Sequence, residues 1–345
     1  MSDVQAFVFR RTGAMLAEIS PDLRSIKWAL NRPGKVEFSM PYTDPKCTRD
    51  ILAVGNWLLF QFESGLEEWG GVIDLPLGRR KFEVDVTGWS GERLLDVRVS
   101  GKDVHFNAMA PGAIFQRTIE LENADYATGI GVGNIYAGGS GLTMRYHYYD
   151  LLRRAQELAR LTGEDFAITT RLVSGQLSFL GNWYQRRGRD VSGAVGFEED
   201  QNVVDSPEPR YDEQGPIANV VYTIGDGVDW GDSRPVGFAT DTESVERYGY
   251  REYSEQQAGV VEPETLNANA AAILETMKQP RTMMSLTVAD ESPGRFADYG
   301  VGDIVNATLF VRGGDEWAFD GKVRVVARQL RPDGLCDLEV AEWTE

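Results

Sequence analysis

The chain has 345 residues, of which 42% are hydrophobic and 10% aromatic. This composition excludes a largely disordered protein and allows two or three domains with their own cores. With 53 acidic and 35 basic residues the net charge is −18, so nucleic-acid binding through a basic patch is not expected. No run of eighteen apolar residues, signal-peptide pattern or cysteine motif is present. We therefore expect a soluble, cytoplasmically made protein in which Cys47 and Cys336 are buried thiols.

The first hundred residues predict short strands separated by turns. Polar and apolar residues alternate most regularly in Lys35–Met40, which follows the turn sequence Asn31–Gly34. Regular spacing of such runs is typical of a β-barrel or sandwich. The predicted strands are Ala6–Arg10, Leu16–Ile19, Ser25–Leu30, Lys35–Met40, Trp57–Phe62, Trp69–Asp74, Phe82–Gly88 and Arg93–Val99.

A smaller mixed unit is predicted from Gly101 to about residue 212. Gly129–Gly133 is interpreted as a flexible loop, because it lacks the strand-then-helix context of a dinucleotide-binding loop. Tyr149–Leu161 carries its apolar residues on one helical face and ends before a glycine. Phe166–Val173 and Gln176–Leu180 then predict a hairpin.

The remaining chain predicts a return to strands, interrupted by one helix. Three prolines near residue 210 indicate a boundary, and Ile217–Ile224 is a β-rich run that we expect to rejoin the first barrel. Glu264–Lys278 is an apolar-faced helix bracketed by prolines, and Thr282–Glu345 is all strands.

The predicted fold class is therefore mainly β with an α/β insertion: two related antiparallel β-barrels plus a smaller mixed α/β domain. The first barrel is discontinuous. The predicted domains are residues 1–100 with 213–262 for the first barrel, 101–212 for the insertion, 263–280 for a connecting helix, and 281–345 for the second barrel.

A weak internal repeat links the two ends of the chain. Each end contains, in this order, Val-Gly, a polar residue, a strand, Glu-Trp, a strand that begins near a glycine, and a final tryptophan. The alternative is that any two barrels share glycine turns and tryptophans. If the repeat is a duplication, residues 54–89 and 301–343 should superpose, and three chains would place six similar barrels around an axis. The repeat positions are Gly55, Trp69, Gly71 and Trp89 at the first end, and Gly302, Trp317, Gly321 and Trp343 at the second.

Six segments, in the same order, resemble the tail hub (baseplate hub) proteins of long-tailed bacteriophages. They are Ser25–Pro41, Ile51–Leu58, Glu68–Ile73, Thr87–Leu95, Ile217–Tyr222 and Arg247–Glu252. The resemblance implies a homotrimeric ring of two barrels per chain, with an inserted α/β domain, that closes the tail tube in the virion. It implies a distal tail or tail tube protein and a tape measure protein on one side, and a tail fibre or central spike protein on the other.

If the resemblance holds, the excess of acidic residues has a function in DNA passage. The alternative is that it serves only to keep the protein soluble. DNA carries one charge per ~1.7 Å of duplex axis, and an acidic lumen would let it pass without binding during ejection. The glycine-rich stretch Gly129–Gly141 is then a candidate plug or hinge loop.

No catalytic, cofactor or metal site is expected. His105 and His147 lie in no zinc-binding pattern, and Asp226–Asp232 is interpreted as a solvated acidic hairpin tip rather than a calcium loop. Arg145–Tyr149 is interpreted as an aromatic packing cluster rather than a sugar- or base-stacking platform. The alternative to a structural hub is a carbohydrate-binding or carbohydrate-cleaving β-protein acting on the host envelope.

Overall fold

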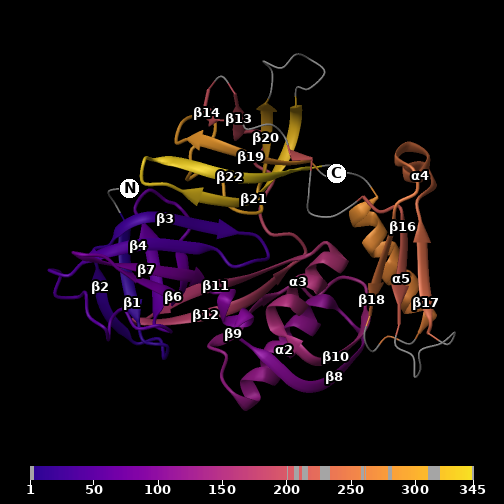
Figure 1. Cartoon of the computed structure of the whole chain (residues 1–345), viewed down its shortest axis with the longest axis horizontal. Coiled ribbons are helices and arrows are strands. Elements are labelled where there is room, and N and C mark those ends of the chain that lie inside the picture. Colours follow the sequence, from indigo (N-terminus) through magenta and orange to yellow (C-terminus); the bar gives the residue numbers. More distant parts are fainter. Residues whose placement is uncertain are drawn as a thin grey trace.

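A computed structural model of the chain describes residues 4–199, 201–205, 210–211, 217–225, 234–257, 260, 262–278, 282–309 and 319–343. Strands make up 49% and helices 18% of it, so the predicted mainly β fold with an α/β insertion is confirmed. Figure 1 shows an N-terminal β lobe at the left, a C-terminal β lobe at the top, an α/β insert below and a side unit at the right. No helix of the described part is long and apolar enough to cross a membrane.

The N-lobe is an antiparallel sheet in the order β3-β4-β7-β6-β5-β1-β2. Val36, Phe38 and Met40 lie at alternate positions of β4 and are buried, because this face of the strand covers the core. Trp57–Phe60 on β5 are all buried, since the insert covers the second face of this strand. The strands are β1 (Val4–Phe9), β2 (Met15–Ile19), β3 (Asp22–Ala29), β4 (Lys35–Pro41), β5 (Trp57–Phe62), β6 (Trp69–Arg79) and β7 (Glu83–Ser90).

The predicted strand Arg93–Val99 is wrong, because the chain forms the short helix α1 (Arg93–Asp96) there. Leu95 of this helix is buried in the core that the N-lobe shares with the insert. A Cβ on Gly91 would lie 2.6 Å from the Ile168 side chain, so the chain turns closely beneath the insert. Tertiary packing therefore overrides the strand preference of this segment.

The insert contains a three-stranded sheet, β11-β12-β9, a two-stranded sheet, β10-β8, and two helices. Its predicted helix is confirmed as α3 (Leu151–Thr162), whose first turn is capped by the Asp150 carboxylate and whose end is set by Gly163 at φ +69°. The other elements are β8 (Val99–Met109), α2 (Pro111–Asp125), β9 (Ile130–Ile135), β10 (Leu142–Asp150), β11 (Asp165–Val173) and β12 (Gln176–Tyr184).

The interpretation of Gly129–Gly133 as a flexible loop is wrong. Most of it belongs to β9, which pairs in parallel with β12. A Cβ on Gly133 would lie 2.3 Å from Oδ1 of Asn182, and this same oxygen accepts the Asn134 N–H at 2.8 Å. The glycine therefore permits close approach of two strands rather than mobility.

The C-lobe follows the order β14-β19-β22-β21, with β20 pairing β21 and β13 pairing β20. β21 also pairs through Ala327–Leu330 with Ile26–Ala29 of β3, which joins both lobes into one sheet over a shared hydrophobic core. The strands are β13 (Gly196–Glu198), β14 (Val203–Asp205), β15 (Arg210–Tyr211), β19 (Thr282–Ala289), β20 (Ile304–Leu309), β21 (Phe319–Leu330) and β22 (Leu335–Glu342).

The predicted return of residues 213–262 to the first barrel is wrong. The described part of this segment forms a separate sheet, β17-β16-β18, which α5 covers. The insertion is also shorter than 101–212, because β13, β14 and β15 pair within the C-lobe. Alternation identifies a strand and its buried face but not its partner strand. The side-unit elements are β16 (Val220–Ile224), β17 (Val236–Thr240), α4 (Thr242–Tyr248), β18 (Glu252–Gln256) and α5 (Pro263–Met277).

Candidate assembly site

The two lobes repeat one strand order. In the N-lobe β5, β6, β7, β4 and β3 are successive antiparallel neighbours, and in the C-lobe β20, β21, β22, β19 and β14 are successive antiparallel neighbours. In each lobe three consecutive strands form a meander, β5-β6-β7 in the N-lobe and β20-β21-β22 in the C-lobe. The last strand of each meander also pairs with a strand that precedes the meander in the chain, β4 in the N-lobe and β19 in the C-lobe. We refer to each set of five strands as a repeat module.

Gly55 introduces the first module. Its φ is +91°, a conformation that strongly favours glycine. Its N–H donates to the Ile73 carbonyl at 2.9 Å, and the Ile73 N–H donates to the Asn56 carbonyl at 2.8 Å. This bonded loop fixes where β5 begins to pair with β6.

Gly302 introduces the second module with the same geometry. Its φ is +96°. Its N–H donates to the Val325 carbonyl at 2.8 Å, and the Val325 N–H donates to the Asp303 carbonyl at 2.9 Å. The two glycines therefore occupy the same place in the same hydrogen-bonded arrangement.

The tryptophan and second glycine positions correspond less simply. Trp69 lies opposite Phe60, whereas the position opposite Ala307 in the second module is Gly321. The strand register therefore aligns Trp69 with Gly321, and Trp317 lies outside the described residues. Trp69 is fully buried, and its indole N–H donates to the Lys27 carbonyl at 3.0 Å, which ties β6 to β3.

Gly71 is required by its own surroundings. A Cβ at this position would lie 2.1 Å from the Trp89 carbonyl oxygen. It pairs with Leu58, and the position opposite Val305 in the second module is Val323. This glycine thus has no glycine counterpart in the strand register.

The last tryptophan of each module lies at a different register position. Trp89 on β7 pairs with Val72 on β6, and its ring lies 5.6 Å from the Lys35 ammonium. Trp343 follows β22, and its ring lies 5.3 Å from the Arg186 guanidinium. Both tryptophans are partly exposed and take part in cation–π contacts.

A polar cluster that the sequence did not indicate joins three parts of the fold, and we call it the junction network. At its centre is Asp165, buried at the start of β11. Its carboxylate accepts the Asn31 side-chain N–H at 3.0 Å and the Arg187 backbone N–H at 2.8 Å, and it pairs with the Arg324 guanidinium. Arg187 in turn pairs with Glu67 at 2.7 Å. Only the charges were visible in the sequence, because these partners lie far apart along the chain.

Glu92 forms a second buried link between the N-lobe and the insert. Its carboxylate accepts the Ile168 N–H at 2.9 Å and the Ser90 hydroxyl. Burial raises the pKa of Glu92 above its ordinary value, although these hydrogen bonds act in the opposite direction. The folded chain therefore retains this proton at pH values at which the unfolded chain has lost it.

This pKa gives a testable pH dependence. Between the ordinary glutamate pKa of 4.5 and the raised folded value, the folded state binds more protons than the unfolded state. Stability contributed by Glu92 therefore falls as pH rises through that window. We expect Glu92→Gln to become progressively more stable than the wild type as pH rises, as measured by urea unfolding at several pH values. A difference in unfolding free energy that stays constant with pH would contradict this.

Arg328 lies where the lobes meet on β21. Its guanidinium is buried over the Trp28 ring at 4.7 Å and donates to the Phe296 and Tyr299 carbonyls at 2.9 and 2.6 Å. These contacts replace part of the solvation that a buried cation loses. The arginine thereby holds the segment before β20 against the strand pair that joins the lobes.

The predicted aromatic packing cluster is partly confirmed. Tyr146 and Tyr149 on β10 are buried, with ring centroids 5.1 Å apart, and Phe106 packs against Tyr146 at 5.3 Å. Tyr148, between them, is 72% exposed. Its outward orientation follows from a bulge in β10 at a positive φ of 44°.

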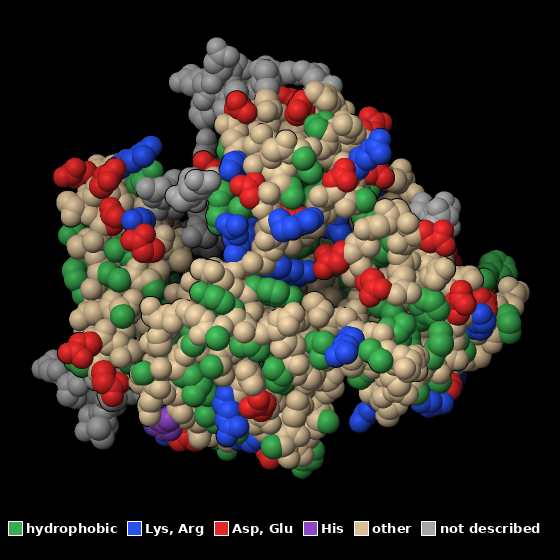
Figure 2. Space-filling model, turned by 180° about the vertical axis from the view of Figure 1, so that it is seen from behind, with side chains coloured by type: hydrophobic (Ala, Val, Ile, Leu, Met, Phe, Trp, Pro, Cys, Tyr) green, Lys and Arg blue, Asp and Glu red, His purple; other side chains and the backbone are tan. Residues whose placement is uncertain are grey.

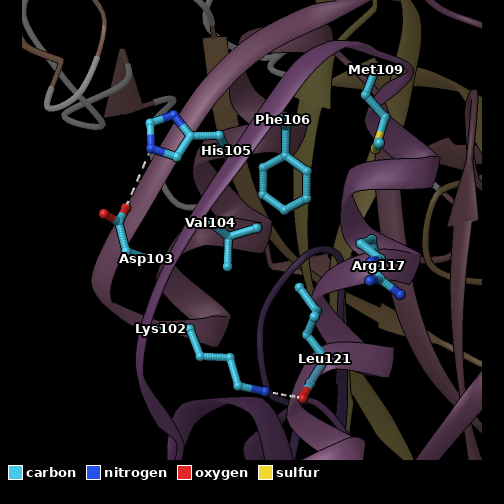
Figure 3. Close-up of a pocket in the computed structure, with 8 residues that line it drawn as sticks. All are labelled: Lys102, Asp103, Val104, His105, Phe106, Met109, Arg117 and Leu121. Atoms are coloured by element: carbon cyan, nitrogen blue, oxygen red, sulfur yellow. Dashed lines mark hydrogen bonds and ion pairs between the residues drawn. The ribbon is translucent and has the colours of Figure 1, made fainter.

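A pocket of about 480 Å³ lies between β8 and α2 (Figure 3). Its charged side chains are paired with other parts of the insert: the Lys102 ammonium lies 3.0 Å from Asp125, and Asp103 accepts from Arg145 at 2.8 Å. His105 lies 3.8 Å from the Asp103 carboxylate. The charged lining residues Lys102 and Asp103 are thus engaged in ion pairs within the insert.

The described residues contain no group of three or more His, Cys, Asp or Glu side chains that could hold a metal ion. Cys336 is buried and Cys47 partly buried, and both are free thiols. Asp226–Asp232, considered as a calcium loop, lies outside the described residues.

Charge is unevenly distributed over the surface. On the face shown in Figure 2, Lys and Arg side chains gather across the middle, below the top lobe, and Asp and Glu side chains lie mostly around them. The acidic side chains behind the net charge of −18 are therefore not spread evenly over this face.

No protein-family model and no curated protein matches the sequence. Among solved structures, the 43 kDa tail protein of prophage MuSo2 from Shewanella oneidensis matches with a TM-score of 0.62 and 12% identity, over 98% of each chain. Prophage tail protein gp18 from Listeria monocytogenes EGD-e matches with a TM-score of 0.60 and 14% identity, over 99% of this chain and 94% of that chain. This chain has the fold of phage tail proteins.

The same fold extends to a secretion system. The E. coli c3393 protein, described as a type VI secretion component structurally similar to T4 bacteriophage tail proteins gp27 and gp5, matches with a TM-score of 0.51 and 10% identity. That match covers 94% of this chain and 75% of the E. coli chain. The resemblance to tail hub proteins is thus confirmed at the level of the fold.

Proposed function

We propose that this chain is a structural tail hub protein of a phage-type virion, synthesised in the host cytoplasm, and not an enzyme. The observation that carries the proposal is the match over 98% of the chain to a prophage tail protein that is itself covered to 98%. A match to both lobes, the insert and the side unit together is more specific than likeness to one β domain.

The assembled form that we propose is a homotrimeric ring with two repeat modules per chain. Three chains present six modules around the axis, a number that fits a six-fold tube. The strand order shared by the modules supports this arrangement, as do the matched bonds at Gly55 and Gly302. The further partners are a distal tail or tail tube protein and a tape measure protein on one side, with a tail fibre or central spike protein on the other.

DNA would pass through this ring without specific binding. The excess of 53 acidic over 35 basic residues supports a lumen that repels the phosphate backbone. The basic side chains in the middle of the face in Figure 2 then belong away from the channel, where they can meet acidic surfaces of neighbouring chains.

The ring is tested by native mass spectrometry over a range of concentrations, with electron microscopy of the same sample. We expect a species of three times the 38.4 kDa chain mass and end-on views with six lobes around a hole. Incubation with cell-wall and capsular polysaccharides provides the functional control. A chain that remains monomeric and releases oligosaccharides would instead support the carbohydrate-cleaving alternative.

A further inference from the structure

The pocket between β8 and α2 lies along the outer edge of β8. It is lined by the five consecutive residues Lys102–Phe106 and by no residue of β10. Side chains of a strand alternate between its two faces, and Figure 3 shows Val104 and Phe106 on the side of β8 that faces α2, with Asp103 and His105 on the other side. A pocket that both faces of a strand reach borders the edge of that strand.

Among the described strands, only β10 pairs with β8. Every residue of the insert itself, from Val99 to Tyr184, is described. In an antiparallel pair about half of the backbone N–H and C=O groups of each strand face the partner strand, and the others face away from it. The outward groups of Asp103–Phe106 therefore offer a template for one more strand.

The pocket continues this edge as a groove with one closed end and an apolar floor. At the closed end the Lys102 N–H donates to the Ser100 hydroxyl at 3.2 Å, and the Lys102 ammonium bonds to the Leu121 carbonyl of α2 (Figure 3). The floor contains the buried Phe106 ring and the partly buried Val104 side chain. An added strand would thus place every second side chain on apolar surface.

The charged groups of the groove favour an acidic partner. Arg117 of α2 is 55% exposed at its side chain, and its guanidinium lies 3.6 Å from the Glu120 carboxylate. Exposed pairs of this kind contribute little to stability, so the guanidinium can accept a second carboxylate in a two-bond contact. Asp103, the one carboxylate of the lining, already accepts from Arg145 at 2.8 Å.

We propose that the outer edge of β8 binds an extended acidic peptide segment of a partner protein as a third strand of this sheet. The segment's backbone pairs with Asp103–Phe106, its apolar side chains contact Val104 and Phe106, and one of its carboxylates pairs with Arg117. In this mode of binding the main-chain bonds supply affinity and the side-chain positions supply specificity. The groove lies within one chain, so the proposal does not depend on the proposed ring.

Binding is tested on the full chain with a fluorescein-labelled peptide of about eight residues, a common strand length, in which valine alternates with glutamate. Fluorescence anisotropy measures the affinity, and hydrogen–deuterium exchange with mass spectrometry measures protection of the β8 amides. A control peptide carries lysine in place of glutamate. Arg117→Glu removes the partner of the carboxylate, and Arg153→Glu, at an exposed position of α3 outside the groove, is the control for the change in charge.

We expect saturable binding of the acidic peptide and slower exchange of amides within Asp103–Phe106. The affinity should fall about tenfold in Arg117→Glu, as expected for loss of a charge-assisted bond, and stay unchanged in Arg153→Glu.

Three results would overturn the proposal. One is the absence of saturable binding and of protection at about 1 mM peptide. Another is equal binding of the lysine peptide, or an equal loss of affinity in the two variants, which would show unspecific attraction. The third is slow exchange of all amides of Asp103–Phe106 in the free chain, which would show that this chain or a second copy already occupies the edge. The ring measured by native mass spectrometry is independent of all three.

Discussion

Replacing Asp165 by asparagine is expected to lower the free energy of unfolding by about 3–5 kcal/mol, the range observed when one partner of a buried ion pair is removed. Asp165 accepts hydrogen bonds from Asn31, Arg187 and Arg324, and all three partners are donors. An asparagine offers a single acceptor oxygen and sets its own N–H₂ group against one of those donors. Urea unfolding followed by tryptophan fluorescence measures the loss.

A double-mutant cycle with Arg324→Gln separates the ion pair from the other bonds. Arg324 also donates to the Arg187 carbonyl at 2.9 Å, so its removal has a cost of its own. Because Asp165 and Arg324 are in direct contact, we expect the double variant to be less destabilised than the sum of the single variants by about 1–3 kcal/mol. Strict additivity would show that the pair contributes nothing beyond its separate hydrogen bonds.

Replacing Gly302 by alanine is expected to destabilise the chain by about 3–4 kcal/mol. Part of the loss comes from forcing a side chain into a positive φ, which costs of order 1–3 kcal/mol. The rest arises because the new Cβ would lie 2.6 Å from the Arg187 backbone oxygen. That backbone is held by the bond from its N–H to Asp165 and cannot move away freely.

Gly55→Ala is the matched control for this substitution. Gly55 has nearly the same φ, but a Cβ there meets nothing within 4 Å. We therefore expect a loss of roughly 1–2 kcal/mol, from backbone strain alone. Equal losses at the two glycines in urea or thermal unfolding would show that the contact with Arg187 is relieved by a small shift, and that strain is the whole effect.

Local structure could be read from the sequence wherever a pattern is complete within a few residues. The apolar face of α3, with Asp150 before it and Gly163 after it, is sufficient to predict that helix. The hairpin of β11 and β12 follows from two β-rich runs around a Ser-Gly turn. The matched role of Gly55 and Gly302 was likewise accessible, because a glycine before a strand is a local signal.

Features that depend on distant residues were missed or misplaced. β16 is a clear strand in the sequence, yet its pattern does not reveal that it pairs with β17 and β18 instead of the N-lobe. The glycines of β9 indicate flexibility when read alone, and only the adjacent Asn182 shows that they allow close strand packing. Asp165 had no local signal, because its partners Asn31 and Arg324 are 134 and 159 residues away.

The sequence by itself determined the mainly β composition, most strands, the helices α3 and α5, and the order of motifs that resembles tail hub proteins. These properties depend on side-chain periodicity and turn residues, which act over one or two turns of chain. The tertiary structure decided which strands pair and where the insert ends. Every strand offers the same backbone donors and acceptors, so its partner is selected by packing and chain connectivity rather than by its own residues.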